Sequence, residues 1–407
     1  MPLASSSLVQ VTYIEEATFG VTPNVGNSKE LRITGESLDY TISKESSAEI
    51  NSSRTVSSMV PTTASASGGL NTEISYLEYD PLIEATLQST FTVFGTAGVG
   101  ATMTADFAPT TITASVATTG VNLFTLLKRG QWFRVNAPTS PGNNGKLFRV
   151  SSTVAPTSTV ITLDPGTPAT AGSAIPNVSV ATSRLTHGVA QKSFSIERRA
   201  GDTGNFLVYR GMTPRQMSVE VSSGSLSSFT FDFMGKDASS GNVTFMPGTP
   251  VASKAFDIHS GVSGAYCAFW LDGAPLTNTF VQSVSLSYDN ALRSQEALCS
   301  LGAVAIGSGT IAITGSMEVY FADGALFDKF KANVNTSMVF TSVDGLGNGY
   351  VFTLPVANIS SYQVQAGGKD QDMMLSLEFT GLRDAANADV TLRRAIFIDR
   401  VGSAVVY

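Results

Sequence analysis

Few side chains in this sequence are of the types that catalyse reactions, and their spacing does not bring them together. The sequence holds two histidines, His187 and His259, and two cysteines, Cys267 and Cys299. A serine or cysteine nucleophile needs a neighbouring base, and neither histidine stands in a catalytic pattern. We interpret both histidines as surface or hydrogen-bonding residues. The sequence therefore predicts no catalytic site, and we expect that the protein is not an enzyme.

Motifs that bind metals or cofactors are also missing from the sequence. Two histidines and two cysteines are too few for a structural zinc site. We interpret the cysteines as free, packed thiols, with a single disulfide as the open alternative. There is no phosphate-binding lysine loop and no dinucleotide fingerprint, and residues 307–309 (Gly-Ser-Gly) suit a hairpin tip. We therefore predict no metal and no cofactor.

Four acidic residues stand out because they lie in two unusually polar segments. Glu45 and Glu49 occupy the first segment, and Asp289 and Glu296 the second. On exposed strands they would serve solubility. In a channel wall they would let a polyanion slide, since a basic lining would hold its phosphates. The residues alone leave both interpretations open.

The elements that would position these acids occur twice along the chain. Alternating strands begin at residues 37–40 and again at 283–286, and each leads into a stretch of small residues. Further on, residues 229–235 (Phe-Thr-Phe-Asp-Phe-Met-Gly) match residues 375–381 (Leu-Ser-Leu-Glu-Phe-Thr-Gly). A repeat on this scale is typical of rings and arrays rather than of enzymes.

Each copy is expected to contain a hairpin and one short helix. Residues 44–69 have almost no large apolar side chains, so we predict a long hairpin that needs a partner chain to cover it. The second hairpin candidate is 288–309. Helices are expected from Pro81 to about residue 88, with Asp80 as the cap, and at about 325–334.

Turn-rich boundaries and the break in the repeat predict three parts. The segment 92–186 begins and ends in Gly/Ala/Thr/Pro-rich linkers and holds short alternating strands at 131–135, 146–151 and 160–163. We interpret it as a small β-domain inserted at a surface loop. It separates a first unit, 1–91 plus 187–245, from a second unit, 246–407. The predicted fold is mainly β: two tandem β-sandwich or barrel units, each with one helix. Segments 1–30 and 390–407 are expected to be extended arms.

Composition limits the classes of partner. The net charge is −7, the charged fraction is 14%, below the usual value of about a quarter, and the pI is about 5.0. A protein that grips a nucleic-acid backbone needs a basic face, which this sequence lacks. The low charge indicates a surface that largely meets other protein. We expect no signal peptide, no membrane helix, and folding in a reducing cytoplasm.

Three segments form a pattern that occurs together: residues 13–23 (Tyr-Ile-Glu-Glu-Ala-Thr-Phe-Gly-Val-Thr-Pro), 198–206 and 231–235. In these segments the chain resembles the major tail tube proteins of long-tailed, non-contractile bacteriophages. Residues 130–135 and 143–150 are similar to the small β-domains that decorate such tubes.

The resemblance implies a structural virion protein of the phage tail, assembled in the host cytoplasm. Such proteins form stacked rings around a continuous inner β-barrel, and double-stranded DNA passes through without sequence-specific binding. Other tail proteins (tape measure, terminator and distal tail) are the implied partners. The usual ring has six single-unit subunits, so two units per chain imply three chains per ring, because a closed ring satisfies every strand edge. The four acidic residues would then line the lumen, and the inserted domain would face outward. A hexamer of two-unit chains is the alternative.

Two other functions compete with this interpretation. The chain could be a different virion protein, for tail completion or capsid decoration, which would not form stacked rings. It could also be a carbohydrate-binding β-module with Trp132 or Trp270 as the sugar platform, although both tryptophans lie in patterns that favour core packing.

Overall fold

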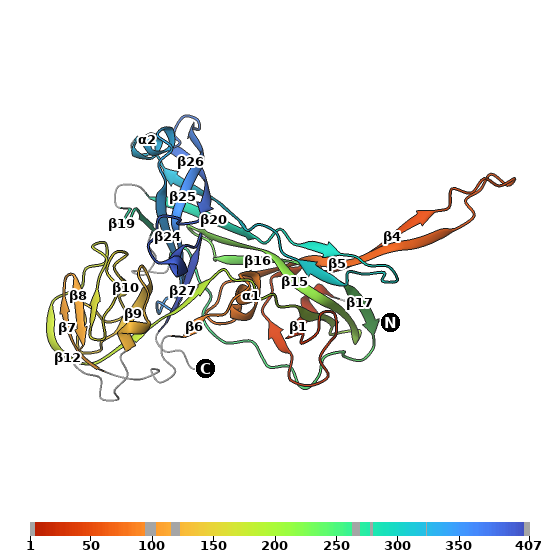
Figure 1. The fold of residues 1–407 in the computed structure, drawn as a ribbon, viewed down its shortest axis with the longest axis horizontal. Coiled ribbons are helices and arrows are strands. Elements are labelled where there is room, and N and C mark those ends of the chain that lie inside the picture. Colours follow the sequence, from red (N-terminus) through yellow and green to blue (C-terminus); the bar gives the residue numbers. More distant parts are fainter. Residues whose placement is uncertain are drawn as a thin grey trace.

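The computed structural model describes residues 5–93, 103–114, 123–262, 269–276, 280–322 and 324–402. This part of the chain is mainly β, with many strands and two short α-helices, which confirms the predicted fold class. The molecule is elongated. A long hairpin projects at one end and a separate six-stranded sheet lies at the other (Figure 1).

One continuous antiparallel sheet, which we call the long sheet, runs through the middle of the molecule. Its strands follow the order β4, β5, β16, β15, β20, β23, β26 and β25. Their bounds are β4 Asp39–Ser46, β5 Met59–Glu73, β15 Asn205–Ser222, β16 Ser228–Gly235, β20 Val281–Asp289, β23 Ala312–Tyr320, β25 Gly349–Ala366 and β26 Met373–Leu382. The long sheet therefore joins strands from both copies of the sequence repeat.

Two long strands, β15 and β25, are bent and each belongs to two sheets. The register shifts between Pro214 and Gln216 in β15 and between Ile359 and Ser361 in β25. A bulge of this kind bends a strand and lets it leave one sheet for another. Residues 205–210 and 216–221, on either side of the bulge, are therefore two halves of the single strand β15.

The first halves of the bent strands build two outer sheets. The first outer sheet has the order β2, β1, β14, β15, β17, and the second has β19, β18, β24, β25, β27, β13, β6. The first adds β1 Val9–Glu15, β2 Lys29–Leu31, β14 Phe194–Ala200 and β17 Asp237–Gly241. The second adds β6 Thr92–Val93, β13 Ser183–Thr186, β18 Phe269–Leu271, β19 Ala274–Pro275, β24 Thr336–Val343 and β27 Phe397–Val401. In pairing order, β2, β1, β14, β15 and β17 of the first outer sheet correspond to β19, β18, β24, β25 and β27 of the second.

A single hydrophobic core fills the space between the long sheet and the outer sheets. It contains Phe231 and Met217 from the first copy and Leu286 and Leu377 from the second, so the two cores are continuous. Burying large apolar side chains contributes about 1.5–3 kcal/mol each, which couples the two halves energetically.

The two helices follow equivalent strands and pack on the same core. Helix α1 is Asp80–Thr86 after β5, and α2 is Ala325–Lys331 after β23. The predicted cap was wrong: Tyr79 is the N-cap and Asp80 is the first helical residue. The Asp80 carboxylate instead accepts hydrogen bonds from the Tyr350 hydroxyl (2.6 Å) and from Arg400. Leaving a buried carboxylate unpaired costs more free energy than losing a helix cap, so Asp80 is used for the ion pair.

The six-stranded sheet takes all its strands from the segment between the two parts of the first copy. Its order is β10, β9, β12, β7, β8, β11. The bounds are β7 Met103–Ala108, β8 Thr111–Ala114, β9 Trp132–Asn136, β10 Leu147–Arg149, β11 Val160–Thr162 and β12 Gly172–Ala181. The three predicted strands correspond to β9, β10 and β11. The sheet encloses a hydrophobic core of its own.

Two predicted arms are wrong. In the segment 1–30, β1 pairs with β14 and β2 and buries Val11 and Tyr13. In the segment 390–407, all five residues of β27 are buried between β25 and β13. The alternating charges there suggested exposure, but Asp399 and Arg400 are each buried against a partner of opposite charge.

The two polar segments form hairpins of unequal length. The predicted hairpin at 44–69 is confirmed as β4 and β5, which extend far from the rest of the molecule (Figure 1). The second candidate, 288–309, contains a short two-stranded ribbon, β21 Arg293–Gln295 with β22 Ala305–Gly307. β3, residues Gly35–Glu36, pairs with β5. The prediction that Cys299 is packed is wrong, since it is free and exposed, and Cys267 lies outside the described residues.

Among the described residues, no α-helix has the length and apolar character needed to span a bilayer.

Candidate functional site

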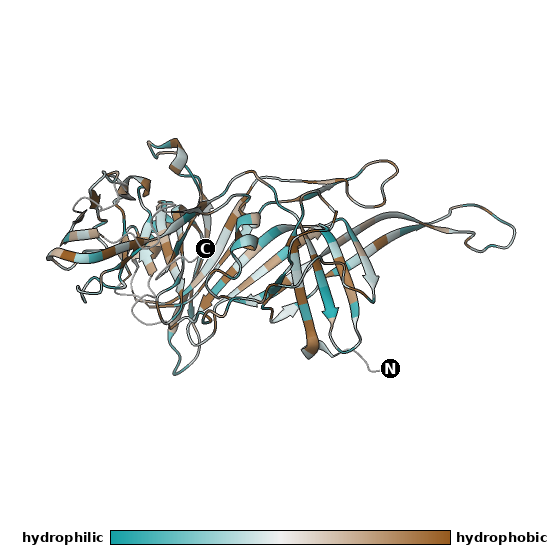
Figure 2. Cartoon of the chain, turned by 90° about the horizontal axis from the view of Figure 1, so that it is seen from below, coloured by the Kyte–Doolittle hydropathy of each residue, from teal (hydrophilic) through white to brown (hydrophobic). Residues whose placement is uncertain are grey.

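The long sheet has one apolar face and one polar face. In β16 the side chains of Phe229, Phe231 and Phe233 are buried, while Thr230 and Asp232 between them are only half-buried. Successive side chains of a strand point to opposite sides of a sheet, so the polar ones share one surface. Figure 2 shows hydrophobic and hydrophilic residues alternating along the extended strands.

We call this surface the polar face and define it by the pairing of the strands. Its residues are Asp39 and Thr41 of β4, Ser65, Ser67, Asn71 and Glu73 of β5, Ser228, Thr230 and Asp232 of β16, Gln216, Ser218 and Glu220 of β15, Ser283, Ser285, Ser287 and Asp289 of β20, Thr314, Ser316 and Glu318 of β23, and Ser376, Glu378 and Thr380 of β26. It therefore crosses from the first copy of the repeat to the second without a break.

Hydrogen bonds between neighbouring strands hold this face together. The hydroxyls of Ser285 and Ser316 lie 2.8 Å apart across β20 and β23. The Gln216 amide donates to the Ser287 hydroxyl at 2.8 Å, across the boundary between the two copies. Cross-strand pairs of this kind stabilise a sheet by about 0.2–1 kcal/mol each. The polar face is a hydrogen-bonded surface and not a collection of loose side chains.

The charge of the polar face is negative. Seven of its residues are acidic, and none is lysine or arginine: Asp39, Glu73, Glu220, Asp232, Asp289, Glu318 and Glu378. The nearest base is Arg215 at the bulge of β15, whose guanidinium lies 3.8 Å from the Asp289 carboxylate. Burial raises the pKa of Asp232; Arg215 opposes this shift and Asp289 adds to it.

Such a surface has a definite chemical character. Hydroxyl and carboxylate groups offer a phosphate backbone no cation to pair with, and like charge repels it. The surface suits a wall that a polyanion passes and does not suit a binding site for one.

The structure separates the four acidic residues that the sequence singled out. Asp289 lies on the polar face, half-buried. Glu45 lies opposite Val60, where β5 no longer pairs with β16, and Glu49 follows in the hairpin loop; both are exposed. Glu296 is exposed beside the short ribbon. Within the described part of the chain, no hydrogen bond joins any two of the four.

Sequence reasoning missed most of the acids on the polar face. Asp232 and Glu378 stand at the same place in the repeated strands 229–235 and 375–381, each between two large apolar residues. An acidic residue at the polar position of an amphipathic strand was the available signal. The four acids predicted from the sequence belong to polar segments, whereas most acids of the polar face lie inside strands whose alternate residues are hydrophobic.

The histidines show no catalytic arrangement among the described residues. His259 is fully buried, with Nδ1 3.0 Å from the Ser342 hydroxyl. Its burial lowers its pKa to about 4, although Asp344 nearby acts in the opposite direction. Burial and Arg394 lower the pKa of the half-buried His187. Nor do the described residues contain a group of three or more potential metal ligands.

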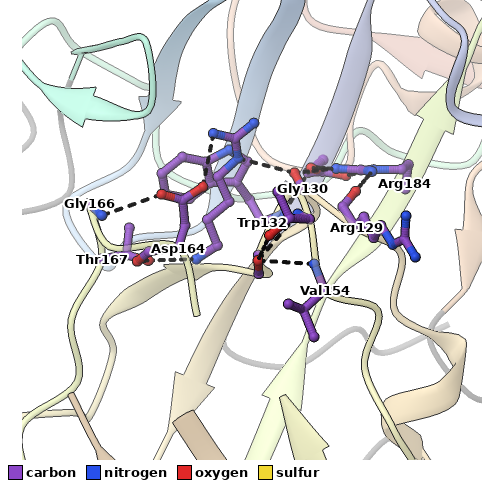
Figure 3. Close-up of polar contacts among 12 residues, drawn as sticks. Arg129, Gly130, Trp132, Val154, Asp164, Gly166, Thr167 and Arg184 are labelled. Atoms are coloured by element: carbon purple, nitrogen blue, oxygen red, sulfur yellow. Dashed lines mark hydrogen bonds and ion pairs between the residues drawn. The ribbon is translucent and has the colours of Figure 1, made fainter. Parts of the chain in front are cut away.

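A cavity of about 820 Å³ lies at the joint between the six-stranded sheet and the second outer sheet. Two of the arginines that line it are paired with carboxylates (Figure 3). The Arg149 guanidinium lies 3.4 Å from the Asp164 carboxylate, and Arg184 makes two bonds of 2.6–2.7 Å to Asp399. Arg184 also donates to the Gly130 carbonyl (2.8 Å). Because these two guanidinium groups are already paired, this part of the cavity has the chemistry of a structural joint.

Both tryptophans are buried in this joint. Trp132 of β9 and Trp270 of β18 have ring centroids 4.4 Å apart, with exposed fractions of 0% and 8%. Core packing of the two tryptophans, as the sequence pattern favoured, is confirmed. Neither ring presents a surface on which a sugar could stack.

Comparison with known proteins places the geometry in context. A family model described as "Phage tail tube protein" matches residues 6–381, nearly the whole chain. No curated protein matches the sequence.

Proposed function

The chain belongs to the phage tail tube protein family and is a structural component of the virion tail, and from this premise we propose that it assembles itself into stacked rings whose lumen conducts DNA from capsid to host. The observation that carries the proposal is the polar face. It is continuous, acidic and hydrogen-bonded, on one side of a sheet whose other side is the core.

We propose that the chain contains two tube units, 1–91 with 187–245 and 246–407, separated by an inserted domain, 92–186. The support is the pairing order. β4, β5, β16 and β15 pair in sequence in the first copy, and β20, β23, β26 and β25 do so in the second. Each copy has its helix after the second of these strands and a bulge in the fourth.

Ring closure favours three chains. The two units meet edge to edge where β15 pairs with β20 along residues 216–222 and 283–289. If neighbouring chains meet in the same way, three chains give six equivalent units in one ring, and no strand edge is left over. A hexamer of two-unit chains would need a twelve-unit ring, or a second unit away from the lumen.

Within such a ring the polar face would line the lumen. We propose that Asp39, Glu73, Glu220, Asp232, Asp289, Glu318 and Glu378 form its acidic wall, and that Glu45, Glu49 and Glu296 extend this wall along the hairpins. Double-stranded DNA would pass without sequence-specific contacts, because the wall repels phosphate. The six-stranded sheet, at the far end of the second outer sheet, would face outward.

The projecting hairpin would join successive rings. It exposes apolar side chains that no other part of the described chain covers, including Ile50 (99% exposed), Val56 (66%) and Met59 (60%). Exposed apolar residues on an unsupported hairpin indicate a protein partner. Along the tube this partner would be a further copy of the chain, in the next ring. The tape measure protein inside the tube, and the terminator and distal tail proteins at its ends, are the other proposed partners.

The first test is cryo-electron microscopy of the concentrated protein without imposed symmetry. We expect tubes of stacked rings with three outward knobs per ring, one for each inserted domain. Six knobs per ring would retain the tube and overturn the three-chain ring. A protein that stays monomeric at high concentration would overturn self-assembly.

A second test examines the lumen. Tubes assembled from the variant Glu220→Lys/Glu318→Lys in the presence of short DNA duplexes should retain DNA that nuclease cannot reach and that high salt releases. The control Asp257→Lys/Asp328→Lys changes the charge equally at exposed residues away from the polar face. Protection by the control, or none by the first variant, would contradict the assignment of the lumen.

A further inference from the structure

The long sheet ends in two strand edges that pair with no further strand among the described residues. β4 pairs with β5 alone, and the second half of β25, from Ser361 to Ala366, pairs with β26 alone. Such edges present a row of backbone donors and acceptors to any strand that can approach. In the rest of the long sheet, every strand lies between two others.

The internal junction shows how these edges can be satisfied. At that junction the second half of β15 pairs with β20. β15 is the last strand of its copy, as β25 is, and β20 is the first strand of its copy, as β4 is. The junction is therefore a template for contact between chains, provided that each residue can be assigned its equivalent.

The pairing assigns the equivalents on β15 and β25. Met217 lies opposite Phe231 in β16, and Tyr362 lies opposite Leu377 in β26. Phe231 and Leu377 are the third residues of the repeated strands, and each bulge ends one residue before Met217 or Tyr362. Met217 and Tyr362 therefore hold the same place.

Glycines assign the equivalents on β20 and β4. Gly315 lies opposite Phe379, and Gly68 lies opposite Phe233. Two residues before these glycines, Ile313 pairs with Tyr288, and Ala66 pairs with Tyr40. The residues preceding these tyrosines also correspond, as Ser-Leu-Ser at 285–287 and Ser-Leu-Asp at 37–39. Residues 37–40 therefore correspond to residues 285–288. This is two residues further along the second copy than 283–286, the match suggested by the sequence.

We propose that β25 of one chain pairs antiparallel with β4 of the next chain in the ring, with Tyr362 opposite Tyr40 and Gln363 opposite Asp39. The inference rests on the proposed function and specifies its contact. It copies the internal register, in which Met217 lies opposite Tyr288 and Ser218 opposite Ser287.

Burial of the equivalent residues supports this register. At the internal junction Met217 and Tyr288 are both 0% exposed. Tyr40 and Tyr362 are only half-buried, although Tyr362 already packs on Phe327 and Phe330 of α2 with ring centroids 5.3 and 6.0 Å away. A neighbouring chain in the proposed register would cover the two tyrosines as the internal junction covers their counterparts.

The polar side of the contact is also complementary. The Gln363 amide can donate to the Asp39 carboxylate on the polar face, and residues 356–366 of β25 carry no charge that would oppose Asp39. A register slipped by one residue would set Tyr362, which its pairing with Leu377 holds on the core side, opposite Asp39 or Thr41 of the polar side. Directly opposite residues of a continuous sheet lie on the same side, so this register is excluded.

Disulfide trapping tests the register directly. Asp39→Cys and Gln363→Cys are combined in one chain whose two native cysteines are replaced by serine, and the assembled protein is oxidised. Directly opposite residues lie within disulfide reach. Each chain then carries one cysteine at either edge, so denaturing electrophoresis without reductant should show a ladder that ends at three chains. The control Ser43→Cys/Gln363→Cys moves one cysteine four residues along β4, about 13 Å away, and should not cross-link.

The outcomes separate this inference from the proposed function. If tubes form and the control pair cross-links, or if tubes form and neither pair cross-links, the proposed register is wrong while the tube itself stands. A ladder that continues to six supports the register and overturns the three-chain ring. Absence of tubes from the wild-type protein as well as from the variants, with no cross-links, overturns the register together with self-assembly. If the cysteine variants do not assemble, a reconstruction of wild-type tubes gives the same answer, and β4 beside any strand other than β25 overturns the inference.

Discussion

Asp399 is the side chain that ties the six-stranded sheet to the second outer sheet. It is fully buried, receives two bonds from Arg184, and accepts the backbone N–H of Trp132 at 2.9 Å. The Arg184 guanidinium also stacks 4.5 Å from the Phe397 ring. Buried ion pairs of this kind add little net stability while intact, but removing one partner leaves an unpaired buried charge.

We therefore expect Asp399→Asn to lower the free energy of unfolding of this joint by about 3–5 kcal/mol. The chain has two tryptophans, both in the joint, so a red shift of tryptophan fluorescence in denaturant reports its opening. The control Lys329→Met breaks the more exposed pair with Asp272 and should cost at most about 1 kcal/mol. Equal losses in both variants would contradict the role of Asp399.

His259 makes stability depend on pH. Burial lowers its pKa to about 4 in the folded protein, whereas the unfolded chain has a value of about 6.5. The unfolded state therefore binds the proton more strongly, and stability present above pH 6.5 is lost as the pH falls toward 4. Between pH 7 and 5 the loss from this residue should be about 2 kcal/mol.

The measurement for His259 is denaturant unfolding at pH 7 and pH 5. His259→Gln keeps a hydrogen-bonding side chain but does not titrate. Between pH 7 and pH 5 the variant should therefore lose about 2 kcal/mol less free energy of unfolding than the wild-type protein does. His187→Gln, at a half-buried histidine, is the matched control. An unchanged pH dependence in His259→Gln would show that other groups carry it.

At the scale of elements, the bent strands and the glycines beside them shape the long sheet and the two outer sheets. The bulges in β15 and β25 let each strand leave the long sheet for an outer sheet. Gly68 and Gly315 lie at equivalent places in β5 and β23, where the backbone or an aromatic ring approaches closely. A Cβ on Gly68 would lie 2.3 Å from the Ser37 carbonyl oxygen, and one on Gly315 would lie 2.4 Å from the Phe379 ring.

Gly68→Ala should therefore destabilise the first unit by at least about 2 kcal/mol, because its φ of +132° adds backbone strain to the steric clash. Gly345→Ala is the matched control, since a Cβ there meets nothing within 4 Å and φ is not in the strained range. Its effect should stay within about 0.5 kcal/mol. Denaturation midpoints compare the two, and equal stability would contradict the packing at Gly68.

At the scale of the whole molecule, the six-stranded sheet stands apart from the long sheet but is not loosely attached. Its joint buries Trp132 against Trp270, Val339 and Val351 of the second outer sheet. The strands on either side of it, β6 and β13, remain in that outer sheet, where Thr92 and Arg184 pair. The long sheet takes no strand from the insert.

Replacing residues 94–181 by a short glycine-containing turn should therefore preserve ring assembly and remove the knobs. Because β6 and β13 pair antiparallel, a tight turn can connect them. The deletion exposes Trp270, so Trp270→Thr is included, and the same substitution in the full chain serves as the control. Electron microscopy reads the result. A folded deletion variant that forms no rings would show that the insert takes part in assembly.

Several features were determined by the sequence alone because they depend on local order. Alternation of apolar and polar residues predicted the strands, and the match of 229–235 with 375–381 predicted that one strand type recurs, because side-chain period and turn chemistry are local. The polar hairpin at 44–69 and the burial of Trp132 and Trp270 followed from the same patterns.

Other features were decided only by the tertiary structure, because they depend on contacts between distant residues. The charges of β27 suggested an exposed arm until Arg184 and Asp80 were found against Asp399 and Arg400. The acidic face became visible only when strand pairing aligned Glu220, Asp232 and Glu378. Each acid is one residue in a hydrophobic strand, and register alone brings them onto one surface.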